Sequence, residues 1–110
     1  MTRGETTEAA VVHVDRDAAV AELVVEAEFS PDRVLGFETT LRRDDELLIF
    51  QALNRHSRPA SGDQRYPALQ LDAALLSPGE YQIYFVPVLL DSTIYPEASI
   101  RGRFVVSDHQ

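Results

Sequence analysis

The chain has 110 residues, of which 45% are hydrophobic and 25% are charged, as in a single ordinary globular domain. Its formal net charge is -8, and all ten of the residues counted as Lys or Arg are Arg. This balance argues against nucleic-acid binding, which depends on clustered basic residues. The absence of cysteine excludes disulfide bonds and thiolate metal sites.

The N-terminal stretch "MTRGETTEAA" contains no apolar core of the kind that a secretory signal needs. The longest apolar run, residues 85–90, is too short to cross a bilayer. We therefore expect a cytoplasmic location without direct membrane insertion. The predicted organisation is one domain over residues 9–107, with flexible tails at 1–8 and 108–110.

Apolar and polar residues alternate with a period of two along much of the chain, which predicts strands. In the first half we expect strands at 9–14, 20–29, 35–42 and 47–53, separated by turns at "DRDA", "SPD" and "RDDE". The segment 20–29 is rich in Ala, Glu and Leu, so a helix is the alternative there. The regular alternation and the turn that follows it favour a strand.

In the second half, the polar stretch 54–66 is rich in chain-breaking residues and is expected to be a loop. Further strands are expected at 68–75, 81–90 and 99–106, with a loop at 91–98. About seven to eight short strands with regularly spaced turns are typical of an all-β protein. The predicted fold is an antiparallel, immunoglobulin-like β-sandwich.

The stretch "SPGEY" predicts a tight corner before the strand at 81–90. Pro78 presets the backbone angle for the second position of a turn, and Gly79 tolerates a positive φ at the third. Tyr81 then opens the strand, as in the tyrosine corner of sandwich folds. A structural role in the turn is sufficient to explain Pro78, Gly79 and Tyr81.

The strand at 81–90 is apolar on both faces. Tyr81, Ile83 and Phe85 can fill the core, while Pro87 predicts an edge strand or a bulge, because it cannot donate to a ladder. An uncovered apolar face predicts a protein interface or a ligand platform. The homodimer interface expected on this basis consists of Tyr84, Val86, Val88 and Leu90. The alternative is that loops of the same chain cover this face.

The sequence contains no recognisable catalytic motif. His13, His56 and His109 stand singly, without zinc-ligand spacing. The acidic turns "DRD" and "DDE" could offer oxygens to calcium, but acidic residues commonly serve as turn formers. The chain has neither a nucleophile elbow nor a glycine-rich phosphate loop. We therefore expect a protein that is not an enzyme and that uses no metal or cofactor.

The stretch "NRHSRP" concentrates Asn54, Arg55, His56 and Arg58 in one segment of an acidic protein. Such a cluster suits a ligand with hydroxyl and carboxylate groups, which accept charge-assisted hydrogen bonds. The alternative is a solvated loop without a ligand.

Three segments together resemble a known family. They are "VLGFETTLRRDDELLIFQALNR", "LLSPGEYQIYFVPVL" and "RGRFVV", and they span roughly the last 75 residues. They resemble the C-terminal, Wzt-type carbohydrate-binding domain of the ATP-binding subunit of O-antigen-exporting ABC transporters. The resemblance implies a cytoplasmic β-sandwich that recognises the end of a lipid-linked polysaccharide and dimerises through its strands. It also implies a transporter ATPase as a possible partner.

The leading hypothesis is thus a non-catalytic carbohydrate-binding module for a polysaccharide or its acidic terminal sugar. The predicted ligand-binding residues are Arg42, Asn54, Arg55 and His56, together with Tyr84 and Tyr95, which would stack on a sugar ring. The alternative is a protein-interaction sandwich, either an adaptor or an intracellular proteinase-inhibitor-like domain. In that case the loops at 54–66 and 91–99 would bind the partner.

Overall fold

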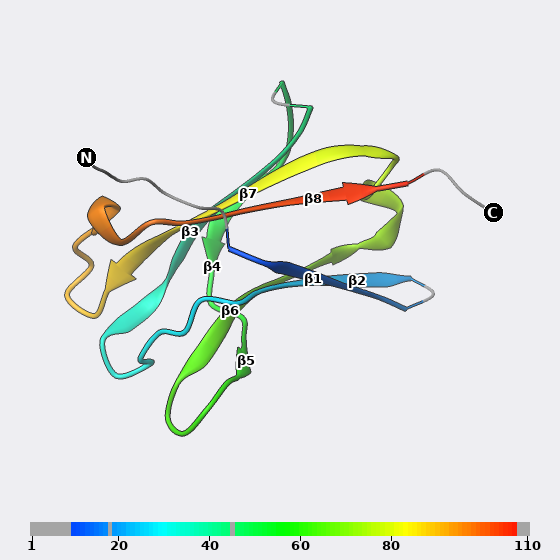
Figure 1. Ribbon diagram of the computed structural model, residues 1–110. Helices are drawn as coiled ribbons and strands as arrows, with labels where there is room; N and C mark the ends of the chain where they lie inside the picture. Colours follow the sequence, from blue (N-terminus) through cyan, green and yellow to red (C-terminus); the bar gives the residue numbers. More distant parts are fainter. Residues whose placement is uncertain (1–9, 18, 45, 108–110) are drawn as a thin grey trace, which may run out of the picture.

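The computed structural model describes residues 10–17, 19–44 and 46–107, so the expected tails at 1–8 and 108–110 lie outside the described residues. The described residues form eight strands, arranged in two antiparallel four-stranded sheets (Figure 1). This confirms the prediction of an all-β sandwich. No helix in the described part of the chain is long and apolar enough to cross a membrane.

We call the two sheets A and B. In sheet A the strand order is β4-β3-β7-β8, with bounds Leu47–Asn54, Val34–Arg43, Gly79–Leu89 and Ile100–Val106. In sheet B the order is β1-β2-β6-β5, with bounds Val12–Arg16, Val20–Val25, Arg65–Asp72 and Ser57–Pro59. Two short 3-10 helices, η2 (Ala73–Leu75) and η3 (Pro96–Ala98), lie before β7 and β8.

The core lies between the sheets and follows from the alternation of each strand. Every second residue of β2, β3, β6 and β7 points inward, and the largest apolar side chains among them are fully buried. They include Leu23, Phe37, Leu41, Leu69, Tyr81, Ile83 and Phe85. Burial of each such side chain contributes about 1.5–3 kcal/mol of transfer free energy. The inner faces therefore account for the fold, and the outer faces are available for function.

Several predicted boundaries are wrong. The first strand is Val12–Arg16 and not 9–14, so half of the expected "DRDA" turn belongs to the strand; Ala18 of that turn lies outside the described residues. The segment at 20–29 is a strand, as favoured over a helix, but it ends at Val25. The expected loop 54–66 contains the short strand β5, which pairs with the start of β6. Pro59 is tolerated there because β5 is an edge strand.

The tyrosine corner is confirmed. Gly79 has φ 153°, a conformation that side chains rarely adopt. The hydroxyl of Tyr81 donates a hydrogen bond to the carbonyl of Ser77 at 2.6 Å, and its ring stacks on Phe104 with centroids 4.9 Å apart. The corner fixes where β7 enters sheet A.

Two alternatives were predicted from Pro87, and the first, an edge strand, is wrong, because β7 pairs with β3 on one side and β8 on the other. The second was a bulge, and the β3–β7 pairing does have a register shift next to Pro87, between Val34 and Gly36 of β3. Its pairing with β8 stops at Phe85, before Pro87. The carbonyl of Pro87 accepts a hydrogen bond from the backbone N–H of Tyr95 at 2.9 Å. The backbone nitrogen and carbonyl of a strand residue point to the same side. The nitrogen of Pro87, which carries no hydrogen, therefore faces the loop, and no hydrogen bond between β7 and β3 is lost.

Candidate functional site

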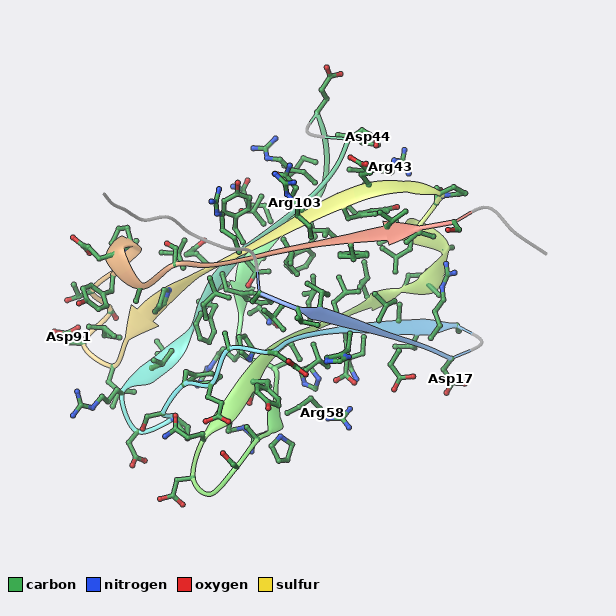
Figure 2. All side chains as sticks on the ribbon, viewed as in Figure 1. Asp17, Arg43, Asp44, Arg58, Asp91 and Arg103 are labelled. Carbon is green, nitrogen blue, oxygen red and sulfur yellow. The ribbon has the colours of Figure 1, made fainter. Side chains whose placement is uncertain are left out.

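The outer face of sheet A gathers polar and cationic side chains. Because Leu41, Ile83 and Phe104 point into the core, their neighbours in the strands point outward. The strand register then places Tyr84 between Thr40 and Arg101, and Gln82 between Arg42 and Arg103. We call these six residues the arginine face. Figure 2 shows Arg103 on this side of the molecule, with Arg58 on the opposite side.

The arginines of this face have few internal partners. In residues 10–17, 19–44 and 46–107, no hydrogen bond or ion pair engages the guanidinium groups of Arg42 and Arg103. The guanidinium carbon of Arg101 lies 5.8 Å from the ring centroid of Tyr84, in a cation–π contact. Glu38 and Glu80 lie on the same side of β3 and β7, one step along the strands. Three arginines outnumber these two glutamates, so this side of sheet A carries a net positive charge, although the whole chain has a net charge of -8.

Two of the predicted ligand residues, Arg42 and Tyr84, belong to the arginine face. Tyr84 is half-buried, and Arg101 covers part of its ring, so the ring is less open to a sugar than the sequence suggested. Arg101 and Arg103 were not among the residues predicted from the sequence. The alternation in "IRGRF" places both arginines on one face of their strand. The sequence does not show that β8 pairs with β7, and this pairing is what brings them next to Tyr84 and Gln82.

Asn54 and His56 have structural roles that the sequence did not reveal. The side-chain amide of Asn54 donates to the carbonyl of Ala68 at 2.5 Å, and its oxygen accepts from the backbone N–H of His56 at 3.4 Å. This contact fixes the chain where it crosses from sheet A to sheet B. The polar atoms of Asn54 are thus already engaged within the protein.

The ring of His56 pairs with Glu22, which was not predicted to matter. The side chain of Glu22 is only 9% exposed on the outer face of sheet B. His56 Nε2 lies 2.5 Å from one carboxylate oxygen, and Arg58 donates to the other at 2.5 Å. A buried carboxylate is tolerated when it is paired in this way, so the cluster has an internal electrostatic explanation.

Arg55 is exposed, and its side chain crosses Gly36 at the start of β3. A Cβ atom at Gly36 would lie 2.9 Å from Arg55 Cγ and 3.0 Å from the carbonyl oxygen of Asn54. Glycine is therefore required here by the close approach of the β4–β5 connection. Arg55 lies apart from Arg42, because Gly36 and Arg42 are at opposite ends of β3.

Tyr95 lies at one end of the sandwich, beside a cavity of about 720 Å³ that we call the end cavity. Asp91, labelled in Figure 2, marks this end. The apolar lining includes Phe29, Val34, Phe37, Pro87, Leu89 and Ile100. The six predicted ligand residues therefore fall in separate places: the arginine face, the β4–β5 connection and the end cavity.

The four residues predicted for a dimer interface are also divided. Tyr84 and Val86 are half-buried on the outer side of β7, whereas Val88 is only 7% exposed. Ile94 pairs with Val88 in an isolated bridge, so the following loop borders this end of the strand. Leu90 is 61% exposed and lines the end cavity.

The acidic turn at 43–46 has a structural explanation at Asp44; Asp45 lies outside the described residues. Asp44 has φ 55°, and its carboxylate accepts a hydrogen bond from the backbone N–H of Glu80 at 3.2 Å. Asp tolerates this left-handed conformation better than most residues. In the described part of the chain, no three His, Asp or Glu side chains are placed to hold a metal ion together.

Comparisons with known proteins found no matching family model, and no match among curated proteins or solved structures.

Proposed function

We propose that this chain is a non-catalytic binding module for an acidic polysaccharide, or for an acidic sugar at its terminus, and that the arginine face is the binding surface. The observation that supports the proposal is the placement of Arg42, Arg101 and Arg103 on one sheet face of a chain with net charge -8. Two of these three guanidinium groups have no partner among the described residues.

The chemistry of this face suits carboxylated sugars. A guanidinium group forms two parallel hydrogen bonds with one carboxylate, which gives both strength and orientation. Adjacent strands lie about 4.8 Å apart, so Arg42 and Arg103 flank Gln82 at a backbone spacing of roughly 10 Å. Thr40 adds a hydroxyl for the sugar oxygens, and Tyr84 a flat amphipathic edge. In this proposal, as the Wzt-type resemblance implies, the module acts in the cytoplasm beside a transporter ATPase.

Calorimetric titration with polygalacturonate, a carboxylated polysaccharide, and with neutral dextran tests this function. We expect binding of polygalacturonate only, and at least about tenfold weaker binding when Arg42→Gln and Arg103→Gln are combined, a loss of 1.4 kcal/mol. Arg33→Gln combined with Arg55→Gln is the matched control, because it also removes two positive charges, both from exposed side chains outside the arginine face. Equal binding of both polysaccharides, or undiminished binding by the double variant, would contradict the proposal.

We also propose that the chain forms a homodimer, through β4 more than through the outer side of β7. Among the described strands β4 pairs only with β3, so its other edge is open. Its side chains Leu47, Leu48 and Leu53 are exposed. A long edge strand with exposed apolar residues is suited to pairing with another chain.

Sedimentation at tens of micromolar, where modest interfaces are populated, tests the dimer. We expect a dimer for the unaltered chain and a monomer for Leu48→Lys, because the added charge would have to be buried in the interface. Val105→Lys is the control, since Val105 is exposed on the opposite edge strand β8. A monomeric unaltered chain, or an equal effect of both variants, would refute the β4 interface.

A further inference from the structure

The end cavity lies between one end of sheet A, the β2–β3 connection and the loop that follows β7. Phe37 forms its floor and contacts Phe29 edge-to-face, with ring centroids 4.9 Å apart. Pro87 and Ile100 line it from sheet A. Its volume of about 720 Å³ falls in the range of small-molecule sites, about 300–1,000 Å³. Such sites are mostly apolar with a few polar groups at defined positions, as this one is.

Backbone hydrogen bonds hold the walls of the cavity in place. On one side, Phe29 and Arg65 exchange two backbone hydrogen bonds of 2.9 Å. On the other side, Leu89 N–H donates to the carbonyl of Thr93 at 2.8 Å, and Tyr95 N–H to that of Pro87 at 2.9 Å. The loop carrying Tyr95 is therefore fixed to the end of β7. A preformed site avoids much of the entropy cost of ordering loops on binding.

The charged groups at the rim differ in how far they are already engaged. The carboxylate of Glu28 accepts a hydrogen bond from the hydroxyl of Ser61 at 3.0 Å. That of Asp91 accepts one from the backbone N–H of Thr93 at 3.0 Å. No hydrogen bond or ion pair engages the guanidinium group of Arg33 with another described residue. The group left available for a ligand is a cation beside an apolar cavity.

We propose that the end cavity binds a small amphiphile with an apolar chain and one carboxylate, with the chain on Phe37 and Ile100 and the carboxylate on Arg33. This proposal does not depend on the arginine face, which lies on the outer side of sheet A and shares no residue with the end cavity. A carboxylate paired with Arg33 gains a bidentate, charge-assisted contact. The apolar chain gains the burial of its surface.

Titration with three ligands of equal chain length separates the two contributions: octanoate, 1-octanol and octyltrimethylammonium. Binding is followed by the methyl NMR signals of the isoleucines, because Ile100 lines the cavity and Ile83 lies in the closed core. We expect octanoate to shift the Ile100 signal, and 1-octanol to do so about tenfold more weakly, a difference of 1.4 kcal/mol. Equal or tighter binding of the cation would overturn the assignment of the head group.

Two variants locate the site. Arg33→Gln should weaken octanoate binding about tenfold and leave 1-octanol binding unchanged. Ala98→Leu, at an exposed position of η3 that lines the cavity, should weaken both. Ala74→Leu is its matched control, an exposed alanine in the other 3-10 helix, η2, and should weaken neither. Arg103→Gln changes the arginine face and should leave octanoate binding unchanged. The amphiphile proposal and the polysaccharide proposal can therefore fail independently of each other.

A different occupant of the end cavity would give a different result in the NMR titration. If a second copy of the chain fills the cavity, the Ile100 signal will shift with protein concentration in the absence of ligand. If octanoate causes no shift at Ile100, or shifts it equally in the unaltered chain and in Ala98→Leu, the proposal is wrong.

Discussion

The two ends of the sandwich are closed in different ways. At the end where β7 begins, Leu76 is only 2% exposed, and Arg16 donates to the carbonyls of Ala73 and Leu76 at 3.3 and 3.1 Å. The stack of Tyr81 on Phe104 seals the same end. The opposite end, where β7 finishes, is not closed in this way and contains the end cavity. Figure 1 shows the η3 helix at that end, in orange, and the connection from β6 to β7 at the opposite end.

The difference arises from where the connecting chain runs. The connection between β6 and β7 passes from one sheet to the other and places Leu76 between them. The loop after β7 instead folds back beside its own strand, where Ile94 pairs with Val88. It extends sheet A and leaves the gap between the sheets unfilled. The β2–β3 connection also crosses between the sheets at this end, but its residues Ala27 and Phe29 line the cavity without filling it. The end is therefore open because, among the described residues, no buried side chain equivalent to Leu76 is placed there.

The same leucine-to-alanine change should have very different effects at the two ends. Leu76→Ala removes a buried side chain and should lower the free energy of unfolding by about 2–5 kcal/mol. Leu90→Ala, at an exposed rim position, should lower it by less than about 0.5 kcal/mol. Urea unfolding of both variants measures this. Equal losses would show that the two ends are not differently packed.

A smaller contrast is expected for the two tyrosines. Tyr81→Phe removes the hydrogen bond to Ser77 and should destabilise the domain by about 1 kcal/mol. Tyr95→Phe removes a hydroxyl without a hydrogen-bond partner among the described residues, and should change stability by less than about 0.5 kcal/mol. Thermal unfolding compares the pair. If Tyr81→Phe is neutral, the corner does not contribute through its hydroxyl.

The smallest effect concerns the rim of the open end. The Thr93 hydroxyl, and then its backbone N–H, stabilise the charged carboxylate of Asp91 and hold its pKa below 3.8. Because the folded-state pKa is the lower one, this contribution is fully present above pH 3.8 and is lost as the pH falls through the lowered pKa. An NMR titration should give a midpoint below 3.8 for Asp91, and Thr93→Val should raise it. A midpoint at or above 3.8 in the unaltered chain would refute this.

The sequence was sufficient for the strands and for the corner, because both depend on local signals. Alternation is read from neighbouring residues, and "SPGEY" carries its turn and its tyrosine together. The short strand β5 was missed because three residues, one of them Pro59, give no detectable period. Its structure depends on pairing with β6, which alternation in a single segment does not reveal.

The candidate sites were less predictable, because they depend on which strands are neighbours. Arg42 and Tyr84 could be placed on outer faces from alternation alone, but Arg103 joins them only because β8 pairs with β7. His56 was read as a ligand contact because its partner, Glu22, is 34 residues away in the sequence. The end cavity could not be foreseen either, since it results from the path of a loop.

The central pairing of sheet A also has a consequence for biosynthesis. Strands β3 and β7 are partners, but β4, β5 and β6 are made between them. On the ribosome, the β3–β4 hairpin therefore emerges with one side of β3 unsatisfied, for roughly a few seconds at 5–20 residues per second. During that interval Leu41 is uncovered, and charged residues such as Glu38 and Arg42 in the same strand are of the kind that oppose premature association.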